Sequence, residues 1–183
     1  MNTTKLFKYL ILIILAFLFV GCAKQAPITN RNQFIIMSES QEISLGEKSY
    51  KETLKKSKLS SNTIQTNRVR NIGKKIASIV NRSDYKWEFN LVENKEKNAF
   101  CLPGGKVVVY TGILDVAKND SQLATVMSHE IAHALARHGA ERVSLGQTSN
   151  IISKIGNIVL SKTNPEYVKA FNKVFSAGSK YAL

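Results

Sequence analysis

Two histidines and a glutamate stand close together in the second half of the chain, in the segment His129-Glu130-Ile131-Ala132-His133. On an α-helix, at about 100° per residue, His129 and His133 differ by roughly 40°, so both imidazoles lie on one side at neighbouring turns. That geometry suits two ligands of one metal ion, and imidazole is a common zinc ligand. Glu130 cannot easily join the same tetrahedron, but it can reach a water bound to the metal. The spacing therefore predicts one zinc per chain, held by His129 and His133, with Glu130 as general base.

This arrangement is typical of peptide hydrolysis. Zinc lowers the pKa of a bound water to about 7 and polarises a carbonyl, while Glu130 takes the proton of the water and returns it to the leaving amine. The alternative is a buried helix whose histidines are hydrogen-bonded core residues. The flanking residues are apolar on nearly all sides, so we expect a buried helix. Metal binding gives such a helix a reason to carry three polar side chains.

Other groups nearby are weaker candidates. On a regular helix, His138 lies about 140° beyond His133, which predicts a surface position or packing behind the ligands rather than metal contact. On a regular helix, Glu141 is likewise not expected to contact the metal. Cys101 has no identifiable base beside it, which favours a strand side chain over a nucleophile.

Helices are expected before and after this segment. Ser38 and Gln41 fit a capping box that opens a helix to about Lys58. A second helix is expected from about Asn62. We expect its core face to comprise Ile64, Val69, Ile72, Ile76, Ile79 and Val80. The histidine motif lies in a helix from about Gln122 to His138, capped by Asp120 or Ser121 and stopped by Gly139. Helices are also expected up to about Asn164 and from Glu166 towards Leu183.

The intervening residues predict a small sheet. Trp87, Phe89 and Leu91 alternate with polar residues, as in a half-buried strand. Two further strands, 98–102 and 106–110, flank Pro103-Gly104-Gly105, whose glycines permit a tight turn. We therefore expect an α+β, mainly helical domain with a small β-sheet beside the histidine helix.

The N-terminus predicts a lipoprotein leader. Lys5 and Lys8 precede an apolar run that is too short to cross a bilayer of about 30 Å comfortably. Residues 1–21 are therefore expected to be a signal peptide that ends before Cys22, whose thiol would be lipidated. The alternative is an uncleaved N-terminal anchor. Ala23 favours the outer over the inner membrane, and residues 22–37 are expected to be a tether.

The net charge alone would also suggest a nucleic-acid-binding protein, because the chain has 26 Lys and Arg but 13 acidic residues. The basic residues are scattered and no basic helix or aromatic and basic strand pair accompanies them. We therefore expect no nucleic-acid partner. We attribute the surplus of basic residues to attraction towards anionic lipid or envelope polymers.

Three linked motifs resemble a known family. Residues 98–105, the segment Val109 to Leu114, and residues 129–138 are similar to the membrane-associated zinc endopeptidases that include HtpX, the CAAX prenyl endopeptidases and periplasmic quality-control proteases. The similarity extends over roughly residues 27 to 183, and the segments 38–43 and Leu45-Gly46 resemble the start of the periplasmic lipoprotein members.

The resemblance implies a gluzincin-like minimal metalloprotease domain over residues 38–183. It also implies that an edge strand borders the cleft and binds extended substrate, and the residues expected there are Asn98, Ala99, Phe100, Gly104 and Gly105. The family takes its third zinc ligand from a glutamate on a later helix, so we expect that ligand beyond Leu183 and the domain to be truncated. Two protein ligands alone would weaken zinc binding and activity.

The sequence thus predicts a zinc metalloendopeptidase on the periplasmic side of the cell envelope, lipid-anchored and active in protein quality control. Its expected substrates are unfolded or misassembled envelope proteins. The alternative is a catalytically inactive, truncated lipoprotein that binds envelope proteins through the edge strand.

Overall fold

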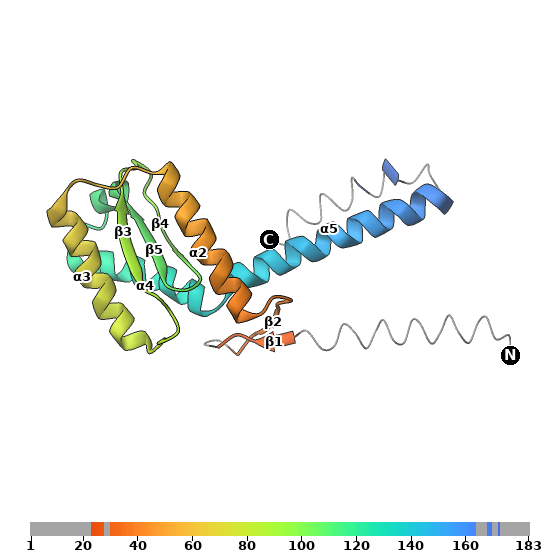
Figure 1. Cartoon of the computed structure of the whole chain (residues 1–183), viewed down its shortest axis with the longest axis horizontal. Coiled ribbons are helices and arrows are strands. Elements are labelled where there is room, and N and C mark those ends of the chain that lie inside the picture. The colour runs from red at the N-terminus through yellow and green to blue at the C-terminus, as the bar shows by residue number, and fades with distance from the viewer. Residues whose placement is uncertain (1–22, 28–29, 164–167, 170–171, 173–183) are drawn as a thin grey trace. The chain divides into compact units, whose positions relative to one another are not determined.

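The computed structural model describes residues 23–27, 30–163, 168–169 and 172 (Figure 1). The expected leader, Cys22 and nearly all of the last expected helix lie outside these residues. No helix in the described part of the chain is both long and apolar enough to span a membrane. The described elements fall into two compact units, one formed by residues 37–139 and the other by two short strands and most of the last helix.

The predicted fold class is confirmed, because the described residues form four helices and a small mixed sheet. The bounds are β1 Ala23–Gln25, β2 Asn32–Phe34, α2 Glu39–Lys56, α3 Thr63–Val80, β3 Glu88–Val92, β4 Ala99–Leu102, β5 Lys106–Tyr110, the 3₁₀ helix η1 Thr111–Asp115, α4 Asp120–Leu135 and α5 His138–Thr163.

The three-stranded sheet has the order β3-β5-β4. β4 and β5 form the expected antiparallel pair, with Ala99 opposite Val109 and Leu102 opposite Lys106. Gly104 and Gly105 adopt φ values of +83° and +82° in the turn between them, which only glycine adopts readily. β3 runs parallel to β5, and this pairing places the central strand between two neighbours.

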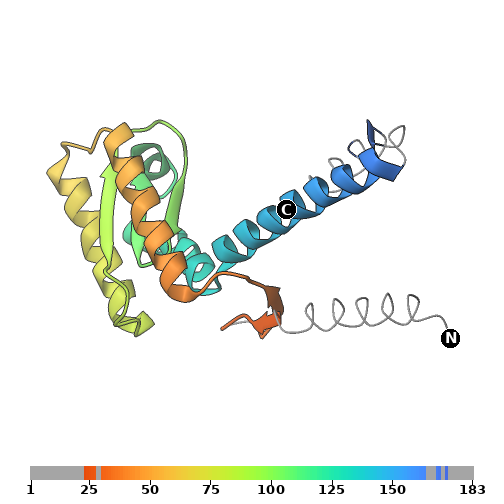
Figure 2. The same ribbon diagram turned by 45° about the vertical axis from the view of Figure 1, so that its right-hand side comes forward.

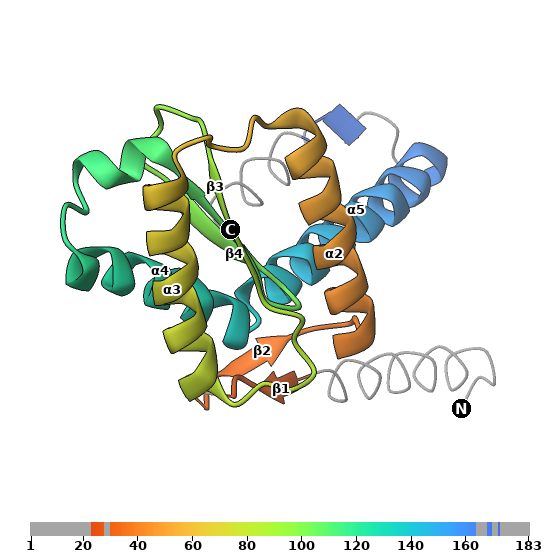
Figure 3. The same ribbon diagram turned by 60° about the vertical axis from the view of Figure 1, so that its left-hand side comes forward.

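Helices cover both faces of this sheet. In Figures 1 and 2, α2 (orange) and α3 (yellow) lie on opposite sides of the strands, and Figure 3 shows α4 beside α3. Because side chains alternate along a strand, Val107 and Val109 join the core with α3 and α4, whereas Val108 packs towards Tyr50 of α2. The sheet is therefore the middle layer of a three-layer unit that holds α4 in place.

The helix starts expected near Ser38 and near Asn62 are confirmed. Ser38 and Gln41 form a reciprocal capping box at α2, and the Asn62 side chain accepts a hydrogen bond from the Gln65 N–H at α3. The expected core face of α3 is only partly right. Val69 and Ile72 are buried, but Ile64 and Ile79, which lie at the two ends of α3, are 80% and 83% exposed.

Gly46 of α2 lies against the turn between β4 and β5. An added Cβ there would stand 2.3 Å from the Pro103 carbonyl oxygen, a backbone atom that cannot move aside by changing rotamer. We expect Gly46→Ala to lower the free energy of unfolding by about 1–3 kcal/mol, measured by urea denaturation.

Gly146→Ala in α5 is the matched control, because nothing lies within 4 Å of its added Cβ. Alanine favours a helix over glycine by up to about 1 kcal/mol, so this variant is expected to be neutral or stabilising. An equal increase in the free energy of unfolding for Gly46→Ala and Gly146→Ala would contradict the close packing of α2 on the turn.

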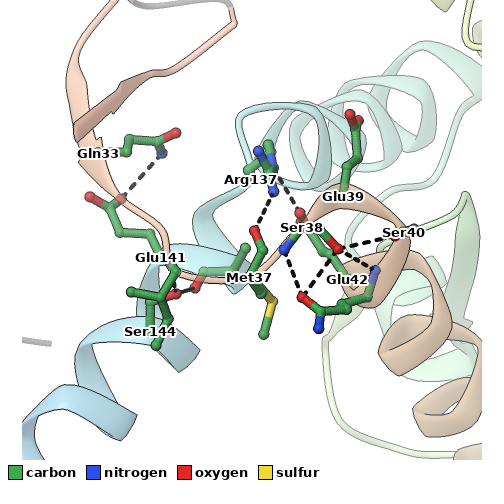
Figure 4. A network of polar contacts seen from close by, with 12 residues as sticks. Gln33, Met37, Ser38, Glu39, Ser40, Glu42, Arg137, Glu141 and Ser144 are labelled. Carbon is green, nitrogen blue, oxygen red and sulfur yellow. Dashed lines mark hydrogen bonds and ion pairs between the residues drawn. The ribbon is translucent and has the colours of Figure 1, made fainter. Parts of the chain in front are cut away.

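In the other unit, β1 and β2 form an antiparallel pair within the segment that we expected to be a tether. Arg31 binds Glu141 of α5 with an Nη2–Oε2 distance of 2.5 Å, and the amide of Gln33 donates to the same carboxylate. The Ile36 N–H donates to the Ser144 hydroxyl, and Figure 4 shows the contact between Gln33 and Glu141. These contacts attach β2 to the first turns of α5.

Candidate metal centre

The helix α4 presents its histidines on an exposed face. Leu123, Met127 and Ile131 are fully or almost fully buried, whereas His129 and His133 are exposed. Our expectation of a helix buried all round was therefore wrong. Ala132 on this face adds to the apolar composition of the helix although its side chain is exposed.

The predicted start and end of this helix also need correction. Asn119, rather than Asp120 or Ser121, is the N-cap, and it forms a capping box with Gln122. The helix ends at Leu135, and Gly139 belongs to α5 instead of stopping α4. The chain turns at Arg137, whose φ is +57°.

Two imidazole nitrogens meet on the exposed face of α4. The Nε2 atoms of His129 and His133 are 3.0 Å apart, and the two rings are nearly perpendicular at 87°. Two nitrogens bound to one tetrahedral zinc at about 2.0–2.1 Å would lie about 3.3 Å apart. The pair therefore fits a zinc ion with a shift of only a few tenths of an ångström.

The structure places His138 differently from the expectation for a regular helix. Its Nδ1 lies 2.6 Å from Nδ1 of His133. The turn at Arg137 interrupts the helical path, so the rotation of about 140° between these residues does not apply. The three histidines of the chain form a row in which His133 is central.

No cluster of three or more metal-binding His, Cys, Asp or Glu side chains is found among the residues that the structure describes. Within this part of the chain, His129 and His133 are the two side chains whose geometry fits a shared metal ion. Glu166, which we did not assign as a ligand, lies outside the described part of the chain.

Glu130 is half-buried and lies next to β4, the strand on which α4 packs. Burial, and secondarily the charge of Glu130, raise the pKa of the Cys101 thiol on β4 to about 12. The carboxylate is thus close enough to the strand to affect Cys101. The thiol stays protonated at neutral pH, which agrees with the interpretation of Cys101 as a strand side chain.

A raised thiol pKa predicts low reactivity in the folded protein. In a Cys22→Ser variant, Cys101 is the remaining cysteine of the two. Its pKa rises from an ordinary 9.0 to about 12 on folding, so the reactive thiolate is depleted at pH 8. We expect Ellman's reagent to label it at least about 100-fold more slowly than in denaturant.

A Ser61→Cys substitution in the same background adds a thiol at an exposed position and is expected to react rapidly in the folded protein. Similar labelling rates for Cys101 in the folded and denatured chain would contradict its burial.

The edge of the sheet next to α4 is formed by β4. The Tyr110 N–H donates to the Asn98 carbonyl, and antiparallel pairs alternate, so Asn98 and Phe100 direct their backbone groups towards β5. Ala99 and Cys101 therefore direct theirs to the outer edge, which no strand in the described residues pairs with. Cys101 was missing from the residues that we expected to bind substrate at this edge, although its place in the alternation was readable.

The two glycines predicted with this strand lie beyond β4. Both are buried in the turn, where added Cβ atoms would stand 3.1 Å from Ile43 at Gly104 and 2.8 Å from Trp87 at Gly105. Gly104 and Gly105 therefore belong to the packed turn, which lies next to the edge of β4, and not to the strand edge itself.

Comparison with known proteins identifies relatives. Residues 63–180 match the profile described as Peptidase family M48. The mitochondrial metalloendopeptidase OMA1 of Schizosaccharomyces pombe is 37% identical over 129 residues, which cover 69% of this chain and 38% of that protein. The Saccharomyces cerevisiae protein of the same name is 33% identical over 170 residues, covering 81% and 48%.

A bacterial relative is also similar. The beta-barrel assembly-enhancing protease of Escherichia coli is 28% identical over 151 residues, which cover 81% of this chain and 31% of that protein. The matches thus span less than half the length of these curated relatives.

Proposed function

This chain belongs to peptidase family M48, and from that premise we propose that it is a zinc-dependent endopeptidase of the cell envelope that acts in protein quality control. The meeting of His129 and His133 at an Nε2–Nε2 distance of 3.0 Å, with Glu130 between them in the chain, is the observation that carries the proposal. Relatives described as metalloendopeptidases support it.

The three residues have separate roles. His129 and His133 would hold zinc through their Nε2 atoms, which lie 3.0 Å apart. Bound zinc supplies a Lewis acid for the carbonyl and lowers the pKa of water. Glu130 would accept a proton from the attacking water on a carboxylate oxygen and would return it to the leaving nitrogen of the peptide.

The outer edge of β4 provides a place for an extended substrate. Ala99 and Cys101 direct backbone N–H and C=O groups to this edge. Backbone pairing there accepts many side-chain sequences, which suits hydrolysis of unfolded or misassembled envelope proteins. The nearby carboxylate of Glu130 is on the helix that packs against this strand.

We also propose that the protein is anchored by lipid on Cys22 on the periplasmic side of the envelope, with the outer membrane favoured by Ala23. The positively charged and then apolar leader supports export. The similarity to a bacterial protease described as beta-barrel assembly-enhancing supports a role in the envelope.

Metal removal tests the proposed activity. We expect the complete protein to cleave unfolded casein, 1,10-phenanthroline to stop the cleavage, and added Zn²⁺ to restore it. The non-chelating isomer 1,7-phenanthroline is the matched control and should leave the rate unchanged. Cleavage that continues at the same rate after chelation would contradict the proposal.

A second candidate function rests on the outer edge of β4, with which no strand in the described part of the chain pairs. A non-catalytic lipoprotein could bind envelope proteins there by strand pairing without hydrolysing them. This alternative predicts casein binding that is insensitive to chelation, together with no cleavage in the presence of Zn²⁺. The chelation experiment therefore separates the two functions.

A further inference from the structure

We propose that His138 is a positioning residue that fixes the orientation and the proton of His133, so that Nε2 of His133 is presented to the metal. The proposal rests on the function proposed above. It starts from the two contacts of His133, whose Nδ1 lies 2.6 Å from Nδ1 of His138 while its Nε2 lies 3.0 Å from Nε2 of His129.

The two contacts use different nitrogens of one ring. Nδ1 and Nε2 of an imidazole point in widely separated directions, so a metal held by the Nε2 atoms of His129 and His133 lies away from His138. His138 therefore contacts the ligand from behind. Metal-binding histidines usually bond a partner through the second ring nitrogen, and this contact has that arrangement.

The proposed role of His133 as a metal ligand determines which of its ring nitrogens carries the proton. A ligating nitrogen must be unprotonated, so a neutral His133 that binds through Nε2 carries its single proton on Nδ1. That N–H can donate only to an unprotonated Nδ1 of His138, which then carries its own proton on Nε2. The hydrogen bond thus selects the tautomer of His133 that can bind metal.

The turn between α4 and α5 brings His138 to this place. The Ala136 and Arg137 N–H groups donate to Ala132 and Ala134 carbonyls at 2.8 and 3.1 Å, closing α4. Arg137 then adopts a left-handed φ of +57°, and α5 begins at His138. Without this interruption, a regular helix would point His138 about 140° away from His133.

A buried ion pair holds the turn. Nε of Arg137 lies 2.7 Å from a carboxylate oxygen of Glu42, and its Nη2 donates to the Met37 carbonyl at 3.5 Å (Figure 4). The side chains of Arg137 and Glu42 are 10% and 3% exposed. The left-handed residue before His138 is thus fixed from α2, far away in the sequence.

Zinc affinity of the complete protein, measured by competition with a chromophoric chelator, tests the proposal. His138→Ala removes the acceptor and is expected to weaken zinc binding about 10- to 100-fold. His138→Asn retains an acceptor oxygen near the position of Nδ1 and should recover much of the affinity. The melting temperatures of the metal-free variants should stay close to that of the wild type, because the effect is on the ligand.

Unchanged zinc affinity in His138→Ala would overturn the proposal and leave the proposed function intact. A loss as large as that of His133→Ala, without recovery in His138→Asn, would also overturn it, since His138 would then be a ligand. Failure of the wild-type protein to bind zinc would instead overturn the proposed function, and the role of His138 with it.

Discussion

Replacement of Glu130 by glutamine is expected to lower the rate of peptide hydrolysis by about 10²- to 10⁴-fold while zinc remains bound. The amide has nearly the same size as the carboxylate but cannot accept the proton of the attacking water. His129 and His133 are unaltered, so the metal content should not change. Casein cleavage and zinc content of the complete protein, measured on the same preparations, check both expectations.

Glu52→Gln is the matched control for this variant, because Glu52 is exposed on α2 and the substitution is chemically the same. It should leave the rate unchanged. Equal rates for Glu130→Gln and the wild type would contradict the role of general base. Loss of zinc together with activity would also contradict it, because Glu130 would then be a metal ligand.

Glu42→Ala is expected to lower the free energy of unfolding by about 3–5 kcal/mol, because it leaves the buried guanidinium of Arg137 without its carboxylate. Burial raises the pKa of Glu42 even though Arg137 opposes this shift. The pair is therefore costly to bury, and breaking it is costlier still. Urea denaturation at neutral pH measures the loss.

Glu47→Ala on the same helix is the control. Glu47 forms an exposed ion pair with Lys51, one helical turn away, and its removal should change stability little. Exchanging both buried partners, in a Glu42→Leu and Arg137→Met double variant, should recover part of the loss of Glu42→Ala. If Glu42→Ala lowered the free energy of unfolding as little as Glu47→Ala, the importance of the buried pair would be contradicted.

The raised pKa of Glu42 gives stability a defined pH dependence. Its folded pKa lies above the ordinary value of 4.5, so the folded state keeps this proton where the unfolded chain has released it. The contribution of Glu42 to stability therefore falls as pH rises above about 4.5. Glu42→Gln cannot titrate and should lack this component of the slope.

Local signals predicted the elements that carry the site. The capping box of Ser38, the helix start near Asn62 and the turn at Gly104 and Gly105 depend on a few neighbouring residues, and each was found where expected. The capping box of Asn119 and Gln122 follows the same pattern as that of Ser38 and Gln41, so this start was readable but missed.

The turn at Arg137 could not be predicted from local signals. Arginine is not a residue that favours a left-handed conformation, and the nearby Gly139 was the stronger stop signal. The turn depends on Glu42, which is far away in the sequence and reaches Arg137 only after α2 has packed. The contact between His133 and His138 requires this interruption of the helix, so it was missed together with the turn.

Zinc X-ray absorption of the complete, metal-loaded protein identifies the atoms that bind the metal. We expect at least two imidazole nitrogens at about 2.0–2.1 Å from the zinc ion. It also predicts loss of stoichiometric zinc in a His129→Ala and His133→Ala double variant that remains folded. Stoichiometric zinc with an unchanged spectrum in that variant would contradict the assignment of these two histidines as the metal ligands.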